Sequence, residues 1–356
     1  MMKKVFFIAI VFTLFGGCSN SLSLLAPYKE SVSVYGLLNQ DDAIQYIRIE
    51  RIFLGEQNAY TMAQNQDSVY FKSGDIKVTL QRWKDGVQVP VGNSGSVMEI
   101  VLTDTLLQAD VGIFNQNERV YKTKPSDKLY NDSEYKLTIH NNKSGKEFTA
   151  QTGLINSFQL LVSTNGSQNV LNPNLSATYP INITPGNGGI VDCYYGSPVN
   201  AGVCGLTMRL NYTENNGSNN AQKHVDIDLG TNYPLQTLGG EKQEFKPTGN
   251  TVLSNLAYLS PVPASGVTRT INNLEFLLTA GGQAVALYNQ VNTSTSLSQS
   301  KANYSNITGG VGVFSCRNQQ IIKRNVTNQS IDTISASSIT CKLRFLNENN
   351  ALSICH

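Results

Sequence analysis

Apolar and polar residues alternate along much of the chain from about residue 30 onward. Side chains that alternate with a period of two lie on opposite faces of a strand, so this pattern predicts β-strands with one buried face. Only the stretch around Met62 favours a short helix. The pattern therefore predicts an all-β protein. Its predicted strands cover residues 31–38, 45–53, 76–83, 97–102, 111–114, 157–162, 207–212, 224–229, 269–278 and 284–288.

Two alternating runs, residues 129–140 and 146–152, flank a turn rich in Asn and Gly and predict a hairpin. Leu129 stands six residues before Tyr135, across a polar corner. This spacing resembles the tyrosine corner of immunoglobulin-like and fibronectin type III sandwiches, in which the hydroxyl is bonded to backbone upstream. The alternative is an ordinary buried tyrosine at the start of a strand. We expect an immunoglobulin/fibronectin-III-like sandwich over residues 28–154 and a larger decorated β-sandwich domain over residues 155–356.

The N-terminus has the pattern of an export signal that ends at a lipid-modified cysteine. Lys3 and Lys4 precede the apolar run 5–15, which is shorter than the ~20 residues that cross a bilayer. Residues 14–18, L-F-G-G-C, resemble the bacterial lipobox, although Phe15 replaces the usual aliphatic residue. We expect a signal peptide over residues 1–17, acylation of Cys18 by lipid such as palmitate, and a tether over residues 18–27. The alternative is an ordinary secretory signal with a coincidental cysteine.

The charge balance excludes an electrostatic nucleic-acid binder. Lys and Arg number 27, and Asp and Glu number 25. Removal of Lys3 and Lys4 with the signal leaves 25 of each, so the mature chain is close to neutral. No basic block is present, so we expect no nucleic-acid partner. Charged residues make up 15% of the chain, well below the ~25% of an average domain, and uncharged polar residues take their place, as in secreted β-proteins.

The sequence has six cysteines, and with Cys18 assigned to lipid an odd number remains. Cys193 and Cys204 flank a short segment with Gly196 and Pro198 as turn formers, which predicts a disulfide between them. The alternative is two buried thiols.

A second disulfide is predicted between Cys341 and Cys355. Two apolar runs flank an Asn-rich turn around Glu348, so the cysteines are expected opposite each other in a terminal hairpin. The rival pairing joins Cys316 to Cys341 across neighbouring strands. Our assignment leaves Cys316 as the odd thiol.

A set of catalytic residues is not evident in the sequence. His224, Asp226 and Asp228 share one face of a predicted strand, where such a row can bind a cation or orient a base. More often it is a solvated strand face. The three histidines lie far apart in sequence and no cysteine pair has the spacing of a zinc knuckle. We therefore expect no metal site, no cofactor and no enzyme activity.

The segment 303–315 reads N-Y-S-N-I-T-G-G-V-G-V-F-S and follows A-L-Y-N-Q-V at 286–291. With V-Y-G-L-L-N at 34–39, it resembles a family of Bacteroidota envelope lipoproteins of unknown function. In that family a tyrosine-containing strand, a polar connector and an N-I-x-G-G-x-G-x-F element close the second domain. The chain departs from the family at its cysteine-containing C-terminus. The residues that match the element are Asn306, Ile307, Gly309, Gly310, Gly312 and Phe314.

The glycines of this element have a physical interpretation of their own. Glycine permits a bulge or a close approach of two backbones. A phosphate loop would need a following Lys-Ser/Thr and a helix, and both are missing from the pattern. We expect either a bulge or a close backbone approach at these glycines.

These observations lead to a hypothesis of a non-catalytic, lipid-anchored protein of the cell envelope. It would be an accessory or binding component at the outer membrane, with an outer-membrane transporter as a possible partner. Residues 19–21 lack an acidic surface-export cluster, which favours the periplasmic face over the cell surface. The alternative is a glycan-binding surface lipoprotein, and the aromatic candidates for that role are Tyr194, Tyr195, Tyr212 and Tyr233.

Overall fold

A computed structural model describes residues 30–52, 66–91, 97–107, 118–162, 169–184, 192–293 and 304–355. The protein is mostly strand, and its strands form one large sheet and a separate small sheet. This confirms the predicted all-β, sandwich-like class. Within the described ranges, no helix has the length and apolar character that a membrane crossing requires.

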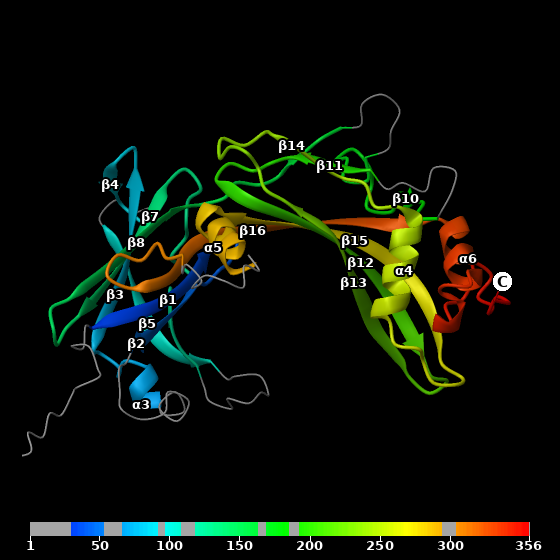
Figure 1. The fold of residues 1–356 in the computed structure, drawn as a ribbon, viewed down its shortest axis with the longest axis horizontal. Coiled ribbons are helices and arrows are strands. Elements are labelled where there is room, and N and C mark those ends of the chain that lie inside the picture. The colour runs from blue at the N-terminus through cyan, green and yellow to red at the C-terminus, as the bar shows by residue number, and fades with distance from the viewer. Residues whose placement is uncertain are drawn as a thin grey trace, which may run out of the picture.

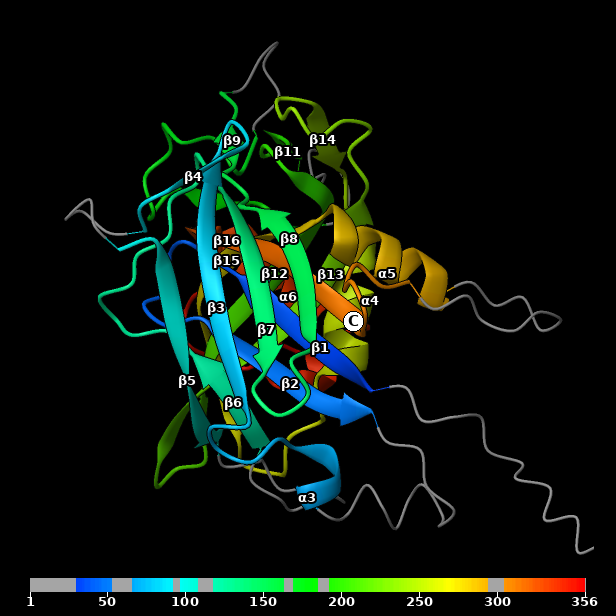
Figure 2. The same ribbon diagram turned by 90° about the vertical axis from the view of Figure 1, so that its left-hand side faces the viewer.

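The first unit folds from the strands before residue 154. Figure 2 shows it as two layers, with β3, β7 and β8 in front of β1 and β2. In β1, Val32 and Val34 point into the core while Tyr35 points outward, as the alternation predicts. Its elements are β1 Ser31–Leu38, β2 Tyr46–Ile52, α3 Gln66–Val69, β3 Ile76–Lys84, β4 Val87–Val89, β5 Glu99–Leu107, β6 Glu118–Lys122, β7 Glu134–Asn141 and β8 Glu147–Gly153.

The tyrosine corner is confirmed. Tyr135 is fully buried, and its hydroxyl accepts a hydrogen bond of 2.7 Å from the backbone N–H of Tyr130. Burial raises the pKa of Tyr135 to about 12, so the phenol stays protonated. This bond fixes the corner that leads into the β7–β8 hairpin.

The second unit is built on long strands that pair in the order β13–β12–β15–β16. The small sheet β14–β11–β9 lies above these strands in the view of Figure 2. Tyr195 of β11 contacts the rings of Phe158 and Phe245. Its elements are β9 Gln159–Leu160, β10 Pro180–Ile181, β11 Cys193–Gly196, β12 Ala201–Asn215, β13 Asn220–Asn232, β14 Lys242–Phe245, α4 Gly249–Leu259, β15 Thr268–Gly282, α5 Gln283–Thr293, β16 Val311–Val326, α6 Asn328–Ala336 and the 3-10 helix Cys341–Leu343.

Two predicted strands of this unit are corrected. Residues 284–288 lie in helix α5. The prediction failed because the apolar side chains of A-V-A-L-Y fit one turn of a helix as well as a short strand. The predicted strand 157–162 is reduced to the two residues of β9. The predicted strand 111–114 and the stretch around Met62 lie outside the described residues.

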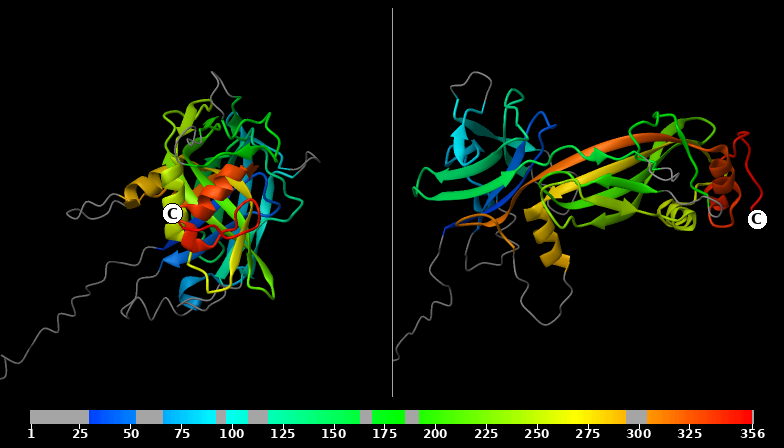
Figure 3. Two further views of the ribbon diagram at one scale, coloured as in Figure 1. Left: turned by 90° about the vertical axis from the view of Figure 1, so that its right-hand side faces the viewer. Right: turned by 90° about the horizontal axis from the view of Figure 1, so that it is seen from above.

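Strand β16 belongs to both units. Its first part pairs in parallel with β1, from Val311 to Cys316, and its second part pairs antiparallel with β15, from Arg317 to Arg324. Figure 1 and the right-hand view of Figure 3 show this strand running from one unit into the other. One hydrophobic cluster likewise includes buried residues of both units. The two units are therefore joined by a continuous sheet, and the boundary near residue 154 divides the chain but not the sheet.

The predicted Cys193–Cys204 disulfide is wrong. The two buried thiols lie on strands of different sheets: Cys193 is opposite Phe245 of β14, whereas Cys204 is opposite Asn232 of β13 and Ala280 of β15. Because β11 and β12 are not neighbours in one sheet, the turn between them does not bring these cysteines together.

The predicted Cys341–Cys355 disulfide is present, with the Cα atoms 5.4 Å apart. The hairpin around it differs from the prediction. Cys341 begins a 3-10 helix, and Leu346 and Leu352 form an isolated bridge that centres the turn on residue 349. The cysteines are thus joined beside a turn and not across a regular ladder. The rival Cys316–Cys341 pairing is excluded in this structure, and Cys316 is a buried thiol.

Replacement of both Cys341 and Cys355 by serine should loosen the C-terminal segment. In the chain-entropy picture a loop of this length contributes ~3 kcal/mol. We expect faster amide hydrogen exchange in residues 341–355 of the double variant, and the same change in the parent after reduction. Reduction of the double variant is the control and should change nothing. A non-reducing peptide map that joins Cys316 to either cysteine would contradict the assignment.

Candidate functional site

The junction of the two units is organised by the segment that leads into β16. The side-chain amide of Asn306 bonds both backbone groups of Phe314: its Nδ2 donates to the carbonyl at 2.7 Å, and its Oδ1 accepts from the N–H at 3.0 Å. Asn306 therefore substitutes for a strand partner. Ile307 and Phe314 are buried in the core, which fixes the face that β16 presents inward.

The glycines of this segment allow β16 to lie against β1. Gly309 adopts a φ of +82° in the turn before the strand. A Cβ on Gly310 would lie 2.7 Å from the carbonyl oxygen of Val32, and a Cβ on Gly312 would lie 2.0 Å from that of Val34. Since real side chains do not approach so closely, only glycine fits. Of the two predicted uses of these glycines, a bulge or a close backbone approach, the close approach is present.

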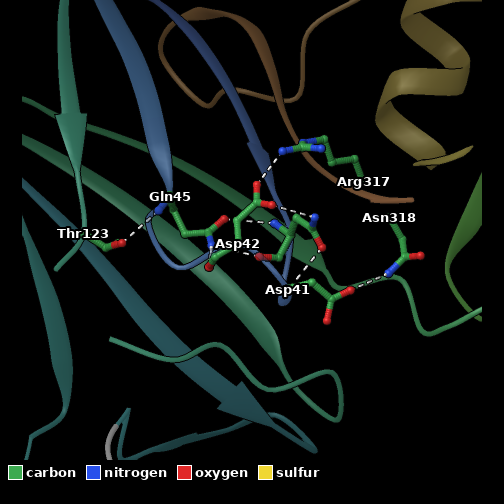
Figure 4. A network of polar contacts seen from close by, with 7 residues as sticks. Asp41, Asp42, Gln45, Thr123, Arg317 and Asn318 are labelled. Carbon is green, nitrogen blue, oxygen red and sulfur yellow. Dashed lines mark hydrogen bonds and ion pairs between the residues drawn. The ribbon is translucent and has the colours of Figure 1, made fainter. Parts of the chain in front are cut away.

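The other end of β1 is held to β16 by a polar network (Figure 4). Gln45 is buried, and its amide bonds the backbone N–H of Asn39 at 2.9 Å and the carbonyl oxygens of Asn39 and Asp42 at 2.8 and 3.0 Å. The loop shaped in this way presents Asp42 to the guanidinium of Arg317. The network fixes β16 at the point where it leaves β1 for β15.

A groove with a volume of about 330 Å³ lies beside this junction, over the outer face of β1, β2 and β16. Tyr35 of β1 stands between Arg48 of β2 and Val313 of β16 in the strand register. Tyr288 of α5 also lines the groove. The aromatic rings therefore come from two elements, a strand and a helix. The complete lining is Ser33, Val34, Tyr35, Arg48, Glu50, Tyr288, Gly312 and Val313.

An ion pair provides the polar part of this groove. Arg48 Nε donates to Glu50 Oε1 at 2.9 Å, and Arg48 Nη1 lies 3.5 Å from Glu118 Oε1. Burial lowers the pKa of Arg48, but the charge and hydrogen bond of Glu50, with the charge of Glu118, outweigh burial and raise it. The guanidinium thus stays charged between two carboxylates.

Two further hollows near the junction are more polar. The first, of about 320 Å³, is lined by β8, the start of α5 and the buried thiol of Cys316, whose pKa burial raises to about 11. In the second, of about 270 Å³, Asp132 is bonded to Lys84 at 2.6 Å and also to Arg82. Lys84 is thus paired with Asp132 in the second hollow, and among the described residues neither hollow is lined by more than one aromatic side chain. The groove with Tyr35 and Tyr288 is therefore the candidate site.

The aromatic residues proposed from the sequence do not form a site. Tyr194, Tyr195 and Tyr212 are all buried, so they pack in the core and cannot present their rings to a glycan. Tyr233 is exposed, but it does not line the groove. This part of the prediction is corrected for Tyr194, Tyr195 and Tyr212, which are buried strand residues.

The row on β13 is a solvated strand face. Arg209 bonds Asp226 through both Nε and Nη2, at 2.7 and 2.8 Å. Asp228 accepts from the backbone N–H of Gly230 at 2.9 Å, and His224 is exposed. Within the described ranges, His, Cys, Asp and Glu side chains nowhere gather in threes that suit a metal ion. Cys18 lies outside the described residues, so its acylation stays a prediction.

Neither a family model nor a curated protein matches the chain. The resemblance to Bacteroidota lipoproteins therefore stays a prediction, and the site has to be interpreted from its own chemistry.

The groove residues were missed because they occupy the outward phase of predicted strands. In S-V-S-V-Y the valines are buried, so Tyr35 falls in the same phase as Ser31 and Ser33. A large aromatic side chain among outward polar residues is a signal that the sequence contained. The sequence pattern did not place Tyr288 beside Tyr35, since it predicts a strand where the structure has helix α5.

Proposed function

We propose that the chain is a non-catalytic, lipid-anchored protein of the bacterial cell envelope that acts as an accessory or binding component at the outer membrane. The observation that carries the binding role is the groove of Tyr35 and Tyr288 beside the strand that joins the two units. Because β16 pairs with both β1 and β15, the groove is held on a continuous sheet. Sites on such rigid elements keep their geometry better than sites on loops.

The lipid anchor is supported by residues 1–18, where charge, a short apolar run, two glycines and Cys18 follow one another. Several acyl chains on one cysteine would hold the protein firmly, since each buried CH₂ contributes ~0.8 kcal/mol. An outer-membrane assembly, with a transporter as one candidate, fits such an anchored body.

Replacement of Cys18 by alanine should release the protein from membranes. In fractionated cells we expect the parent in the membrane fraction and Cys18→Ala in the soluble fraction, and mass spectrometry of the parent should show acyl groups on the N-terminal peptide. Ser19→Ala is the matched control and should remain membrane-bound. Unchanged membrane binding of Cys18→Ala would contradict the anchor.

A pull-down from gently solubilised membranes tests the accessory role. We expect the parent to recover the same outer-membrane protein from independent preparations, and the Cys18→Ala variant to recover much less of it. Recovery of no envelope protein by a folded, acylated parent would argue against an accessory component.

The second candidate function is a glycan-binding surface lipoprotein. The specific observation in its favour is the exposure of Tyr35 and Tyr288, whose side chains line one groove. Protease treatment of intact cells separates the two membrane faces: a surface protein is degraded, whereas a periplasmic protein is protected.

A further inference from the structure

We propose that the groove formed by Ser33, Tyr35, Arg48, Glu50 and Tyr288 binds a neutral oligosaccharide. The inference rests on the proposed binding role and adds to it the residues and the chemical class of the ligand. Three properties of the groove favour such a ligand: its aromatic rings, its paired charges and the pairing of β1 on both sides.

The aromatic rings provide apolar surface in an otherwise polar setting. Tyr35 is 56% exposed and Tyr288 is 41% exposed, although most large side chains of the neighbouring strands are buried. The C–H faces of a pyranose ring are apolar and carry a slight positive charge, and they stack on the negative face of an aromatic ring. Tyrosine also offers a hydroxyl at the edge of that contact. Two tyrosines on one groove therefore suit a ring with an apolar face and a polar rim.

The ion pair supplies hydrogen-bonding groups of both kinds at one place. The guanidinium of Arg48 only donates hydrogen bonds, and the carboxylate of Glu50 only accepts them. They lie 2.9 Å apart, so neighbouring sugar hydroxyls can use one group each. A sugar hydroxyl both donates and accepts hydrogen bonds. A donor beside an acceptor therefore suits a hydroxyl better than a purely anionic or cationic group.

The local charge argues against an anionic ligand. Arg48 is flanked by Glu50 and Glu118, so the cluster of three side chains carries a net negative charge. A sulfate, phosphate or uronate group would meet two carboxylates beside a single guanidinium. A neutral ligand avoids this repulsion.

The strand pairing argues against a peptide that adds a strand. β1 is paired on one side with β2 and on the other with β16, so its backbone groups are already used. A peptide that binds by strand addition needs a free edge. Recognition over β1 must therefore come from side chains, as expected for a sugar.

The volume of about 330 Å³ is near the lower end of the ~300–1,000 Å³ range of ligand pockets. Such a groove holds a short part of a ligand, and a longer chain can extend over the outer face of β1 and β2. A linear oligosaccharide has this shape.

Binding to an array of neutral and acidic oligosaccharides tests the proposal with the full acylated chain in detergent. The probes are linear hexasaccharides of glucose, mannose, galactose and xylose, with uronic-acid and sulfated chains for comparison. We expect at least one neutral hexasaccharide to bind, with calorimetry then giving its dissociation constant. Tyr35→Ala and Tyr288→Ala should each weaken that binding by about tenfold, since each removes a stacked ring.

Two variants serve as controls. Tyr35→Phe keeps the ring and should retain most of the binding. Tyr258 lies on α4, is 86% exposed and does not line the groove, so Tyr258→Ala should bind as the parent does. Unfolding curves of all variants show whether a loss of binding reflects a loss of fold.

Three outcomes would overturn the proposal. A folded parent that binds no neutral hexasaccharide, or binds only acidic chains, refutes the ligand class. Binding that Tyr35→Ala and Tyr288→Ala leave intact refutes the site, and a peptide captured through these tyrosines replaces the sugar as ligand. Membrane fractionation tests the lipid anchor and the pull-down tests a protein partner, so a failure of the proposed function is distinguishable from a failure of sugar binding.

Discussion

Gly312→Ala is expected to destabilise the protein by more than about 3 kcal/mol, a size that point mutations reach only through a specific steric or electrostatic fault. The new Cβ would lie 2.0 Å from the carbonyl oxygen of Val34 and 2.9 Å from its carbonyl carbon. Gly312 also has a φ of +117°, which side chains rarely adopt. Relief of both faults requires β16 to move away from β1, which breaks the pairing from Ser33 to Leu38.

Urea unfolding followed by tryptophan fluorescence measures this loss. The single tryptophan, Trp83, lies on β3 of the first unit and reports on the body that β16 completes. Gly266→Ala is the matched control, because Gly266 has a φ of +86° but no atom within 4 Å of its Cβ position. The stability of Gly266→Ala should fall only by the ~1–2 kcal/mol that a side chain costs at a left-handed backbone position. Equal losses for the two variants would show that the close approach to β1 is not required.

Arg269→Ala should cost about 3–5 kcal/mol, as expected when one partner of a buried ion pair is removed. The side chain is 1% exposed, and its Nε and Nη2 donate to Glu214 Oε2 at 3.0 and 2.9 Å. Nη2 also donates to the carbonyl oxygen of Pro261 at 2.9 Å. The guanidinium lies 5.3 Å from the ring centre of Tyr212. Alanine would leave a carboxylate and a carbonyl without this donor and would open a cavity between them.

Arg209→Ala is the control for this prediction. Arg209 makes a bidentate pair with Asp226 on the neighbouring strands, but both side chains are partly exposed, so its removal should cost less than about 1 kcal/mol. Arg269→Lys keeps the charge without the planar fork and should recover only part of the loss. If Arg269→Ala and Arg209→Ala unfold at the same urea concentration, the buried pair does not stabilise the second unit.

The same pair predicts a pH dependence. A hydrogen bond from Lys223 and, against the opposing effect of burial, one from Arg269 lower the pKa of Glu214 below its ordinary 4.5. A carboxyl whose pKa is lower in the folded state contributes stability above the unfolded pKa and loses it as the pH falls through the folded value. The contribution of Glu214 should therefore be complete at neutral pH and decline in acid, and Glu214→Gln should remove this dependence.

The parts of the fold that depend on local pattern were predictable. Alternation identified β1, β2, β3 and β15, and the spacing of Leu129 and Tyr135 identified the corner. Helix α4 was missed although Thr248 caps it and its buried residues Val252, Leu253 and Leu256 have helical spacing.

The parts that depend on distant pairing were not predictable. Cys193 and Cys204 are close in sequence, but their strands join different sheets, and no local pattern records that choice. The groove exists because β16 pairs with β1, and it also needs Tyr288 from α5. The predicted alternation of buried and exposed residues in β1 was correct. The sequence therefore implied that Tyr35 faces outward, but it did not identify the residues that lie beside Tyr35 in the groove.

The order in which the chain emerges during synthesis gives β16 a further consequence. The hydrogen bond from Ser31 Oγ to the carbonyl of Gly309 spans 278 residues, so the first unit lacks one of its strands until nearly the whole chain has been made. Until then, one edge of β1 is open to any strand from another chain, which is a hazard for aggregation. The first unit is thus completed by the same strand that completes the second unit, so the two units fold cooperatively. A chain interrupted before residue 311 would leave both units unfinished.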